Sequence, residues 1–292
     1  MTTKNLIKFE SPIKGLFTSE GSGAKVNRVI GNGKIRMWDP FLLLDDFQIP
    51  STAGFPDHPH RGIQTLTYVR EGEVTHRDSM GNKGTLTPGA AQLLTSGSGI
   101  IHSEFPGKEV AKGMQLWINI PKRLKMTDPS YQDFKAHEIP QVSLKDGSSL
   151  RVILGESHGS KAVIESICTP LKYIHYELKP KATVNDVVSA KHQGFIFVRN
   201  GSILVTGESG KIELKEGFVL PFDEIEEEEH FEITNSDSNA EVYLVSGIPL
   251  HEPVAFGGPF VMNTREEIEH AYREFYSGNF IKKKAEFYKA DL

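Results

Sequence analysis

The sequence predicts an all-β protein, and two observations support this prediction. The first is that most apolar runs are short and rich in β-branched or aromatic residues, as in residues 64–69, 115–120 and 194–198. Several runs alternate apolar and polar residues and end at glycine or Asn-Gly turns, such as residues 81–84 and 200–201. Short strands with a turn about every 8–12 residues are typical of a β-sandwich or a β-barrel.

The second observation is an internal repeat. Residues 68–73 (Tyr-Val-Arg-Glu-Gly-Glu) resemble residues 197–202 (Phe-Val-Arg-Asn-Gly-Ser) at an offset of 129. Residues 86–89 (Leu-Thr-Pro-Gly) then resemble residues 214–217 (Leu-Lys-Glu-Gly) at an offset of 128. Two matches at nearly the same offset indicate two copies of one β-fold in tandem.

The repeat divides the chain near its middle. Residues 121–140 have no clear periodicity and are interpreted as an interdomain connection. We therefore predict a first domain over residues 1–134 and a second over residues 135–292, a length that suits two domains.

One helix is expected near the C-terminus, within the second predicted domain. Thr264 and Glu267 have the spacing of a capping box, in which the N-cap hydroxyl and the glutamate satisfy each other's backbone N–H groups. Apolar residues then recur at helical spacing at Ile268, Ala271, Tyr272 and Phe275. Gly278 is expected to end the helix, whose apolar side packs on a sheet.

Two tripeptides carry the strongest functional signal. His58 and His60 flank one residue, and so do His102 and Glu104. Residues i and i+2 of a β-strand share a face, so two adjacent strands would bring three imidazoles and one carboxylate together. That is the ligand set of a mononuclear metal site.

The donor types indicate which metal to expect. Structural zinc sites typically use cysteine thiolates, and this chain has a single cysteine, Cys168. Three histidines and one carboxylate leave two positions open on an octahedral metal, as in non-haem iron oxygenases. Iron(II) is therefore the first expectation, and manganese, cobalt, nickel, copper or zinc would also suit this set of donors.

The second half of the chain does not repeat the histidine pair. The offset places Val187 and Ser189 opposite His58 and His60. His230 and Glu232 fall opposite His102 and Glu104, but they follow the acidic run 223–229, and an acidic run is usually a solvated face. We expect the first half to hold the metal.

Composition excludes several classes of function. The net charge is −5, whereas proteins that bind nucleic acid directly are usually basic, so direct binding to nucleic acid is not expected. One cysteine allows no intramolecular disulfide and suits a reducing compartment. The first residues lack the apolar region of a signal peptide, and no apolar run approaches a membrane span. An intracellular, cytoplasmic protein is expected.

Five segments together resemble the pirin family, whose members are bicupins of the cupin superfamily. The Leu-Thr-Pro-Gly tetrapeptide already quoted is one of them, and two others contain the histidine motifs. The five segments are residues 39–47, 55–62, 86–89, 97–104 and 258–264. The resemblance implies two cupin β-barrels, the first binding iron and the second without metal. It implies the iron ligands His58, His60, His102 and Glu104.

One departure from the general cupin pattern concerns Gln64. That pattern has a glutamate four residues after the second histidine, where this chain has Gln64. In pirins this position resembles an outer-shell residue, so the site is expected to survive. An amide there would alter hydrogen bonding around the ligands, although Gln64 is equally well interpreted as a plain sheet residue.

The resemblance also implies two alternative functions. Family members resemble quercetin 2,3-dioxygenases, which open the central ring of a flavonol with dioxygen and release carbon monoxide. Glu104 is then expected to act as both ligand and general base.

Eukaryotic pirins resemble transcriptional coregulators instead, which implies a transcription-factor partner and residence in the nucleus as well. Lys282, Lys283 and Lys284 form the one basic cluster of interest, and such a triplet is usually a solvated helix end. A monomer is expected, because a tandem barrel completes its own symmetry.

Overall fold

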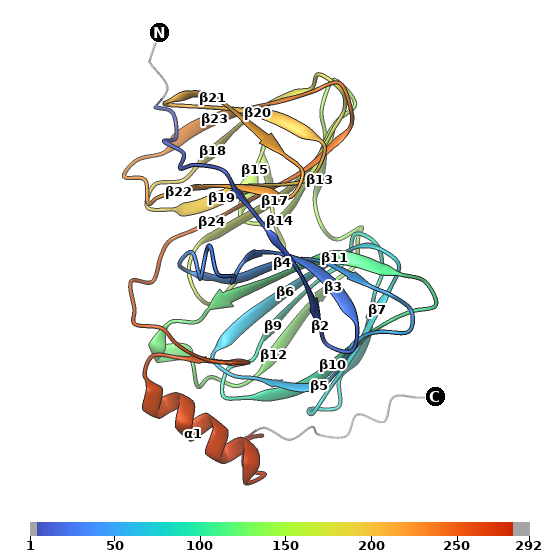
Figure 1. Cartoon of the computed structure of the whole chain (residues 1–292), viewed down its shortest axis with the longest axis vertical. Helices are drawn as coiled ribbons and strands as arrows, with labels where there is room; N and C mark the ends of the chain where they lie inside the picture. Colours follow the sequence, from blue (N-terminus) through green and yellow to red (C-terminus); the bar gives the residue numbers. More distant parts are fainter. Residues whose placement is uncertain (1–4, 283–292) are drawn as a thin grey trace. The chain divides into compact units, whose positions relative to one another are not determined.

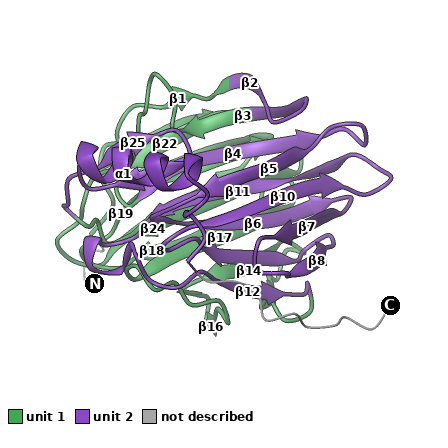
Figure 2. Ribbon diagram, turned by 90° about the horizontal axis from the view of Figure 1, so that it is seen from below, with its two compact units in different colours: residues 1–16, 27–40, 137–250 green, residues 17–26, 41–136, 251–292 purple. Residues whose placement is uncertain are grey.

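The computed structural model describes residues 5–282, so Lys283 and Lys284 of the basic triplet lie outside the described residues. The chain divides into two compact units (Figure 2). One comprises residues 17–26, 41–136 and 251–292, and we call it the histidine unit. The other comprises residues 1–16, 27–40 and 137–250, and we call it the second unit.

The histidine unit is built on two β-sheets (Figure 1). The larger sheet has the strand order β12-β9-β6-β11-β4-β3-β2, with bounds Ser130–Phe134, Ala91–Thr95, Ile63–Glu71, Ala111–Asn119, Phe41–Ile49, Ala24–Ile30 and Leu16–Glu20. Of its last two strands, residues 27–30 of β3 and Leu16 of β2 are assigned to the second unit. The smaller sheet has the order β5-β10-β7-β8, with bounds Phe55–His60, Ile100–Pro106, Val74–Asp78 and Lys83–Leu86. Buried apolar side chains such as Val69, Val74 and Leu86 form a core cluster of this unit.

The second unit repeats this arrangement. Its larger sheet has the order β1-β22-β19-β24-β17-β14-β13, with bounds Ile13–Lys14, Phe218–Phe222, Gln193–Asn200, Ala240–Gly247, Leu171–Leu178, Ser149–Leu154 and Gln141–Ser143. Its smaller sheet has the order β18-β23-β20-β21, with bounds Thr183–Val188, Glu229–Asn235, Ser202–Gly207 and Gly210–Lys215. A short hairpin pairs β15 with β16, with bounds Glu156–Ser157 and Ser160–Lys161.

The two units share one topology. The eight strands from β4 to β11 pair in the same order as the eight strands from β17 to β24. Antiparallel strands form all the pairs within both sets, with adjacent side chains alternating between the two faces. The internal repeat therefore corresponds to two all-β domains of the same kind.

The two compact units do not follow the predicted division into residues 1–134 and 135–292, because each unit includes a segment from the opposite end of the chain. Ile7 and Phe9 are buried in the core of the second unit, where the Phe9 ring lies 5.9 Å from the Phe222 ring. Strand β1 also pairs with β22 there. Residues of the N-terminal segment thus supply apolar area to the unit that is distant in sequence.

The predicted helix exists, but it belongs to the histidine unit. Helix α1 spans Arg265–Tyr276 and begins with the expected capping box between Thr264 and Glu267. Its buried residues Ile268 and Ala271 pack against Phe260 of the hairpin that joins β25 (Ala255–Gly257) to β26 (Phe260–Met262). This burial against residues of the same unit explains why α1 does not accompany the second unit. No helix in the described part of the chain has the length and apolar character that a membrane span requires.

The expected irregular connection over residues 121–140 contains two regular elements. A 3-10 turn, η1, spans Lys122–Leu124, and β12 adds an edge strand to the larger sheet of the histidine unit. Strand β12 alternates poorly in its own sequence, so its pairing with β9 is what fixes it as a strand.

Candidate metal centre

The three histidines of the sequence motif meet on one face of the smaller sheet. Strand β5 supplies His58 and His60, and β10 supplies His102. The antiparallel register places His102 directly opposite His58, so their side chains project from the same face. One residue, Pro59, separates the two β5 histidines, so the alternation of side chains along the strand puts both on a common side.

The imidazoles lie close enough to share one ion. One ligand atom from each of His58, His60 and His102 lies within 4.8 Å of the others. The ring centroids are 4.4 Å apart for His58 and His102, 4.8 Å for His58 and His60, and 5.0 Å for His60 and His102. His60 and His102 are buried and His58 is partly exposed, so the group opens toward solvent on one side.

The nitrogen atoms of these rings are left with lone pairs that no neighbour uses. Nδ1 of His60 and both ring nitrogens of His102 are buried without a hydrogen-bond partner among the described residues. Nδ1 of His58 lies 2.8 Å from the carbonyl of Pro56, and because a carbonyl only accepts, this nitrogen carries the hydrogen. In the neutral ring the Nε2 atom of His58 then carries no hydrogen, so its lone pair is available to a metal. Orphaned polar atoms of this kind are rare in a folded protein.

Burial also keeps two of the rings uncharged. Burial, with the neighbouring His58 ring, lowers the pKa of His60 to about 3, although a hydrogen bond to the Pro259 backbone acts in the opposite direction. Burial, followed by the His60 and His58 rings, holds the pKa of His102 well below its usual range. Neutral imidazoles are the form that binds metals. The residues therefore fit a divalent transition metal with three nitrogen donors.

Glu104, the fourth expected ligand, does not join this group of three. It is buried on β10, but the β10–β5 register shifts between His102 and Glu104. Its Oε1 lies 3.5 Å from the Thr67 hydroxyl, the long limit of a hydrogen bond. Burial raises the pKa of Glu104 against the opposing effect of His58, His76 and Thr67. Its role as ligand stays a prediction.

Gln64 is buried in β6, where its Nε2 donates a hydrogen bond to the Thr95 hydroxyl at 2.8 Å. Thr95 belongs to β9, the neighbouring strand of the larger sheet. This contact ties two strands together.

The structure also adds a residue that sequence reasoning missed. His76 lies on β7, directly opposite Glu104 of β10, and is buried. It has no second histidine at paired spacing, so a search for ligand motifs does not find it. The signal in the sequence is weak: His76 alternates with the polar residues Thr75 and Arg77 in a strand that starts at the buried Val74.

Lys125 fixes the chain just beyond the β5 histidines. Its buried ammonium donates to the carbonyls of Gly62 and Val261 and to the side-chain oxygen of Asn119, at 2.7–2.9 Å. Burial lowers the pKa of Lys125 to about 8, against the opposing effect of nearby glutamates, so the ammonium stays mostly charged at neutral pH.

Replacing Lys125 with methionine is expected to lower the free energy of unfolding by about 3 kcal/mol, because three buried acceptors lose their donor. Urea unfolding followed by circular dichroism measures the change. Lys112→Met is the matched control, because Lys112 is partly exposed and pairs with the exposed Glu71 at the surface. Equal unfolding curves for both variants would contradict the assigned role.

The corresponding face of the second unit holds different chemistry. His230 and Glu232 alternate with the core residues Phe231 and Ile233, so they lie on the opposite face of β23. Phe231 is the residue paired with Asp186 of β18, in the position that His102 and His58 occupy in the other unit. Asp186 accepts hydrogen bonds from Lys172, Tyr176 and Ser157, a set of buried side chains.

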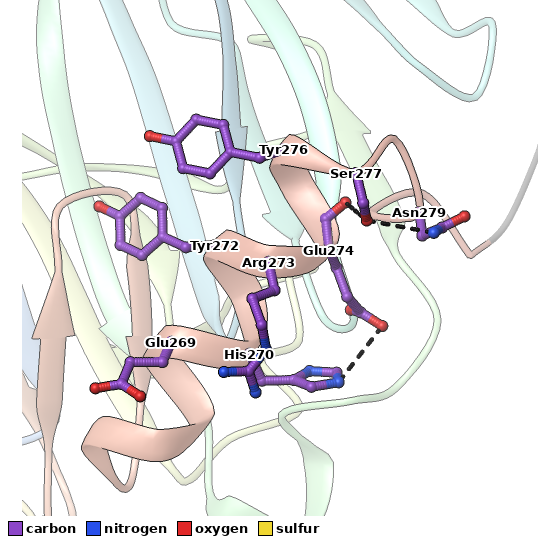
Figure 3. Close-up of a pocket in the computed structure, with 8 residues that line it drawn as sticks. All are labelled: Glu269, His270, Tyr272, Arg273, Glu274, Tyr276, Ser277 and Asn279. Atoms are coloured by element: carbon purple, nitrogen blue, oxygen red, sulfur yellow. Dashed lines mark hydrogen bonds and ion pairs between the residues drawn. The ribbon is translucent and has the colours of Figure 1, made fainter.

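A separate hollow is lined by residues of α1 and of the turn that follows it (Figure 3). Its lining comes from residues 269–279, and no metal-site histidine contributes to it. Figure 3 shows His270 directed toward Glu274, which also holds the buried guanidinium of Arg61 at 2.7 Å. Within this lining, His270 and Glu274 form a pair, and Glu274 also pairs with Arg61 and Lys282 outside it.

Comparison with known proteins identifies the family. Residues 23–118 match the pirin family, and residues 173–281 match the pirin C-terminal cupin domain. The chain is 38% identical to pirin of Homo sapiens over 279 residues, which cover 94% of each chain. The chain belongs to the pirin family.

Other pirins and one solved structure agree with this assignment. A pirin-like protein of Solanum lycopersicum is 39% identical over 263 residues, covering 89% of this chain and 88% of the relative. A crystal structure of quercetin 2,3-dioxygenase from Acinetobacter baumannii superimposes with a TM-score of 0.85 at 32% identity, covering 94% of this chain and 98% of that one. The two repeated units are therefore the two cupin domains of a pirin.

Proposed function

We propose that this pirin is an iron(II)-dependent dioxygenase of the quercetin 2,3-dioxygenase type. Its reaction would cleave the central ring of a flavonol with one molecule of dioxygen and release carbon monoxide. The observation that carries the proposal is the group of three imidazoles with unused buried nitrogens inside one cupin domain. The 32% identity to a protein named quercetin 2,3-dioxygenase supports the same activity.

His58, His60 and His102 would hold the metal, with Glu104 as the fourth ligand. When bound, a metal of this kind acts as a Lewis acid toward a hydroxyl and relays electrons between substrate and dioxygen. Iron(II) suits imidazole and carboxylate donors with open positions; nickel, cobalt, manganese, copper and zinc are tested beside it.

Glu104 would remove the proton of the flavonol hydroxyl. Burial raises the pKa of this carboxyl above its ordinary value, which makes it a stronger base than an exposed carboxylate. The partly exposed side of His58 is where the substrate would enter, because the other two histidines are buried.

Purified protein loaded with each metal in turn is expected to consume oxygen and release carbon monoxide when quercetin is added. Glu104→Gln is expected to keep the metal bound by the three histidines while lowering kcat at least about a hundredfold, the usual loss for a general base. Oxygen uptake and metal content are the two measurements. Glu232→Gln, on the outer face of β23, is the control.

Two outcomes would contradict this proposal. Full activity of the Glu104→Gln variant removes the base role. Absence of quercetin turnover with every metal removes the enzyme assignment and favours the alternative predicted from the sequence, a redox-sensitive coregulator that acts through a protein partner.

A further inference from the structure

His76 stands beside the metal centre on a third strand of the same sheet. The strand order β5-β10-β7 places β7 on the other side of β10 from His58 and His60. In the β7–β10 register, His76 lies opposite Glu104. Directly opposite residues of antiparallel strands project from the same face with their Cβ atoms about 4.5–5.5 Å apart. His76 and Glu104 therefore share the face that carries the imidazole group.

The His76 ring is held firmly by its surroundings. It stacks on the Tyr131 ring with centroids 5.3 Å apart and an angle of 25°. A Cβ at Gly84, which pairs with His76 across β7 and β8, would lie 2.4 Å from the His76 Nε2 atom. Glycine at position 84 is thus what gives the ring its room. These contacts leave the imidazole one orientation.

The hydrogen bonds of Gln92 fix which ring nitrogen carries the hydrogen. The Gln92 Nε2 atom lies 2.7 Å from the His76 Nε2 and 2.8 Å from the Asp133 Oδ1. An amide nitrogen has two hydrogens, one for each of these acceptors. The Asp133 Oδ2 atom lies 3.6 Å from the same Nε2, outside hydrogen-bond distance. The closer Gln92 amide therefore makes the His76 Nε2 an acceptor, and in this tautomer the hydrogen is on Nδ1.

That Nδ1–H has nothing to bind among the described residues. The His76 side chain is 2% exposed, and its Nδ1 is buried without a hydrogen-bond partner. A buried donor without a partner costs on the order of 1–3 kcal/mol, so this one needs an explanation. This donor lies on the face of the sheet that carries Glu104 and the three imidazoles.

We propose that His76 is a substrate-binding residue of the metal centre, whose Nδ1–H donates a hydrogen bond to an oxygen atom of the bound substrate. This inference rests on the proposed function and extends it. It predicts that the substrate class carries a hydrogen-bond-accepting oxygen, a carbonyl or a deprotonated hydroxyl, close to the atoms that bind the metal. Flavonols have such a pair of neighbouring oxygens.

The test compares isosteres of the two ring nitrogens. Asparagine places an amide nitrogen near the imidazole Nδ1 position, and glutamine places one near Nε2. Anaerobic titration of nickel-loaded protein with quercetin, followed by absorbance, gives Kd without turnover, and metal analysis gives occupancy. His76→Gln and His76→Phe are expected to weaken binding about tenfold to a hundredfold, whereas His76→Asn keeps most of the affinity. Metal content stays at the wild-type level in all three variants.

Two further variants sharpen the result. Gly84→Ala is expected to weaken binding as well, because the added Cβ displaces the His76 ring. His175→Phe is the matched control: His175 is also buried and stacked on a tyrosine, Tyr243, but it lies in the second unit. Quercetin binding by this control should equal that of the wild type.

Several outcomes would overturn the inference. One is equal quercetin affinity in His76→Gln and wild type, and another is loss of metal from the His76 variants. A loss of affinity that disappears in the Glu104→Gln background would mean that His76 acts through Glu104 instead. Failure of the proposed function is a different result: wild type binds quercetin anaerobically and His76→Gln does not, yet no metal supports turnover.

Discussion

His102→Ala is expected to abolish metal binding and to leave the fold intact. His102 is one of three nitrogen donors, and outer-shell residues alone are worth about 10–100-fold in metal affinity. The loss of a ligand should therefore exceed a hundredfold, with a matching loss of flavonol turnover. Because both His102 nitrogens are buried without partners, the metal-free variant should be at least as stable as the metal-free wild type.

Trp117 offers a direct measurement of this effect. Its ring lies 5.0 Å from the His60 ring, so a paramagnetic metal held by His60 should quench Trp117 fluorescence. The chain has two tryptophans, and Trp38→Phe leaves Trp117 as the only emitter. Nickel titration should quench the Trp117 fluorescence of the Trp38→Phe protein. The fluorescence of the double variant Trp38→Phe with His102→Ala should stay unchanged. His230→Ala, on the outer face of β23, is the control; quenching that survives in His102→Ala contradicts the three-histidine site.

The second large effect is expected in the other unit. Lys172→Met should lower the free energy of unfolding of the second unit by about 3–5 kcal/mol, because it leaves the Asp186 carboxylate buried without its cation. The ammonium lies 2.8 Å from Asp186 and also donates to the carbonyl of Val187. Replacing both partners, in Lys172→Met with Asp186→Asn, should recover part of the loss, because no buried charge remains.

Unfolding of this unit can be followed separately. Trp38 lies in the second unit, where its Nε1 donates to the carbonyl of Phe222. Urea unfolding monitored by fluorescence in a Trp117→Phe background therefore reports the second unit. Lys181→Met is the control, because Lys181 and its partner Asp237 are largely exposed to solvent. A double variant no more stable than Lys172→Met would contradict the charge argument.

The Lys172–Asp186 pair also predicts how the stability difference between wild type and Lys172→Met depends on pH. Burial acts to raise the pKa of Asp186, but Lys172 and three hydrogen bonds outweigh it, so the folded pKa is lowered. A carboxylate with a lowered pKa stabilises the fold above its unfolded pKa of about 4, and that contribution is lost as the pH falls through the folded pKa. The stability difference between wild type and Lys172→Met should therefore shrink below about pH 4. A difference that stays constant from pH 7 to pH 3 would contradict this.

Local patterns in the sequence predicted what depends on local geometry. The alternation of β-strands was enough to bring His58, His60 and His102 together, and the capping box at Thr264 began the helix where expected. The register shift beside Glu104 is not encoded in the motif, so the position of its carboxylate relative to the histidines could not be predicted.

Long-range packing decided what the sequence alone could not. His76 has no motif of its own, and its significance comes from the strand that pairs with Glu104. The strand β12 depends on pairing with β9, and the burial of Phe9 depends on a core formed more than 200 residues later. In the repeat, the offset placed His230 opposite His102, but alternation about Phe231 turned it to the outer face.

The histidine unit combines residues 41–136 with a segment from the C-terminal end of the chain, and this affects its biosynthesis. Domains generally fold as they leave the ribosome, the N-terminal one first. Here the histidine unit includes residues 251–282, so its last elements emerge only after the entire second unit has been translated. A nascent chain released early would expose Leu42 and Ile63, which Val261 of β26 covers in the complete unit. Loading of the metal should accordingly follow completion of synthesis rather than accompany it.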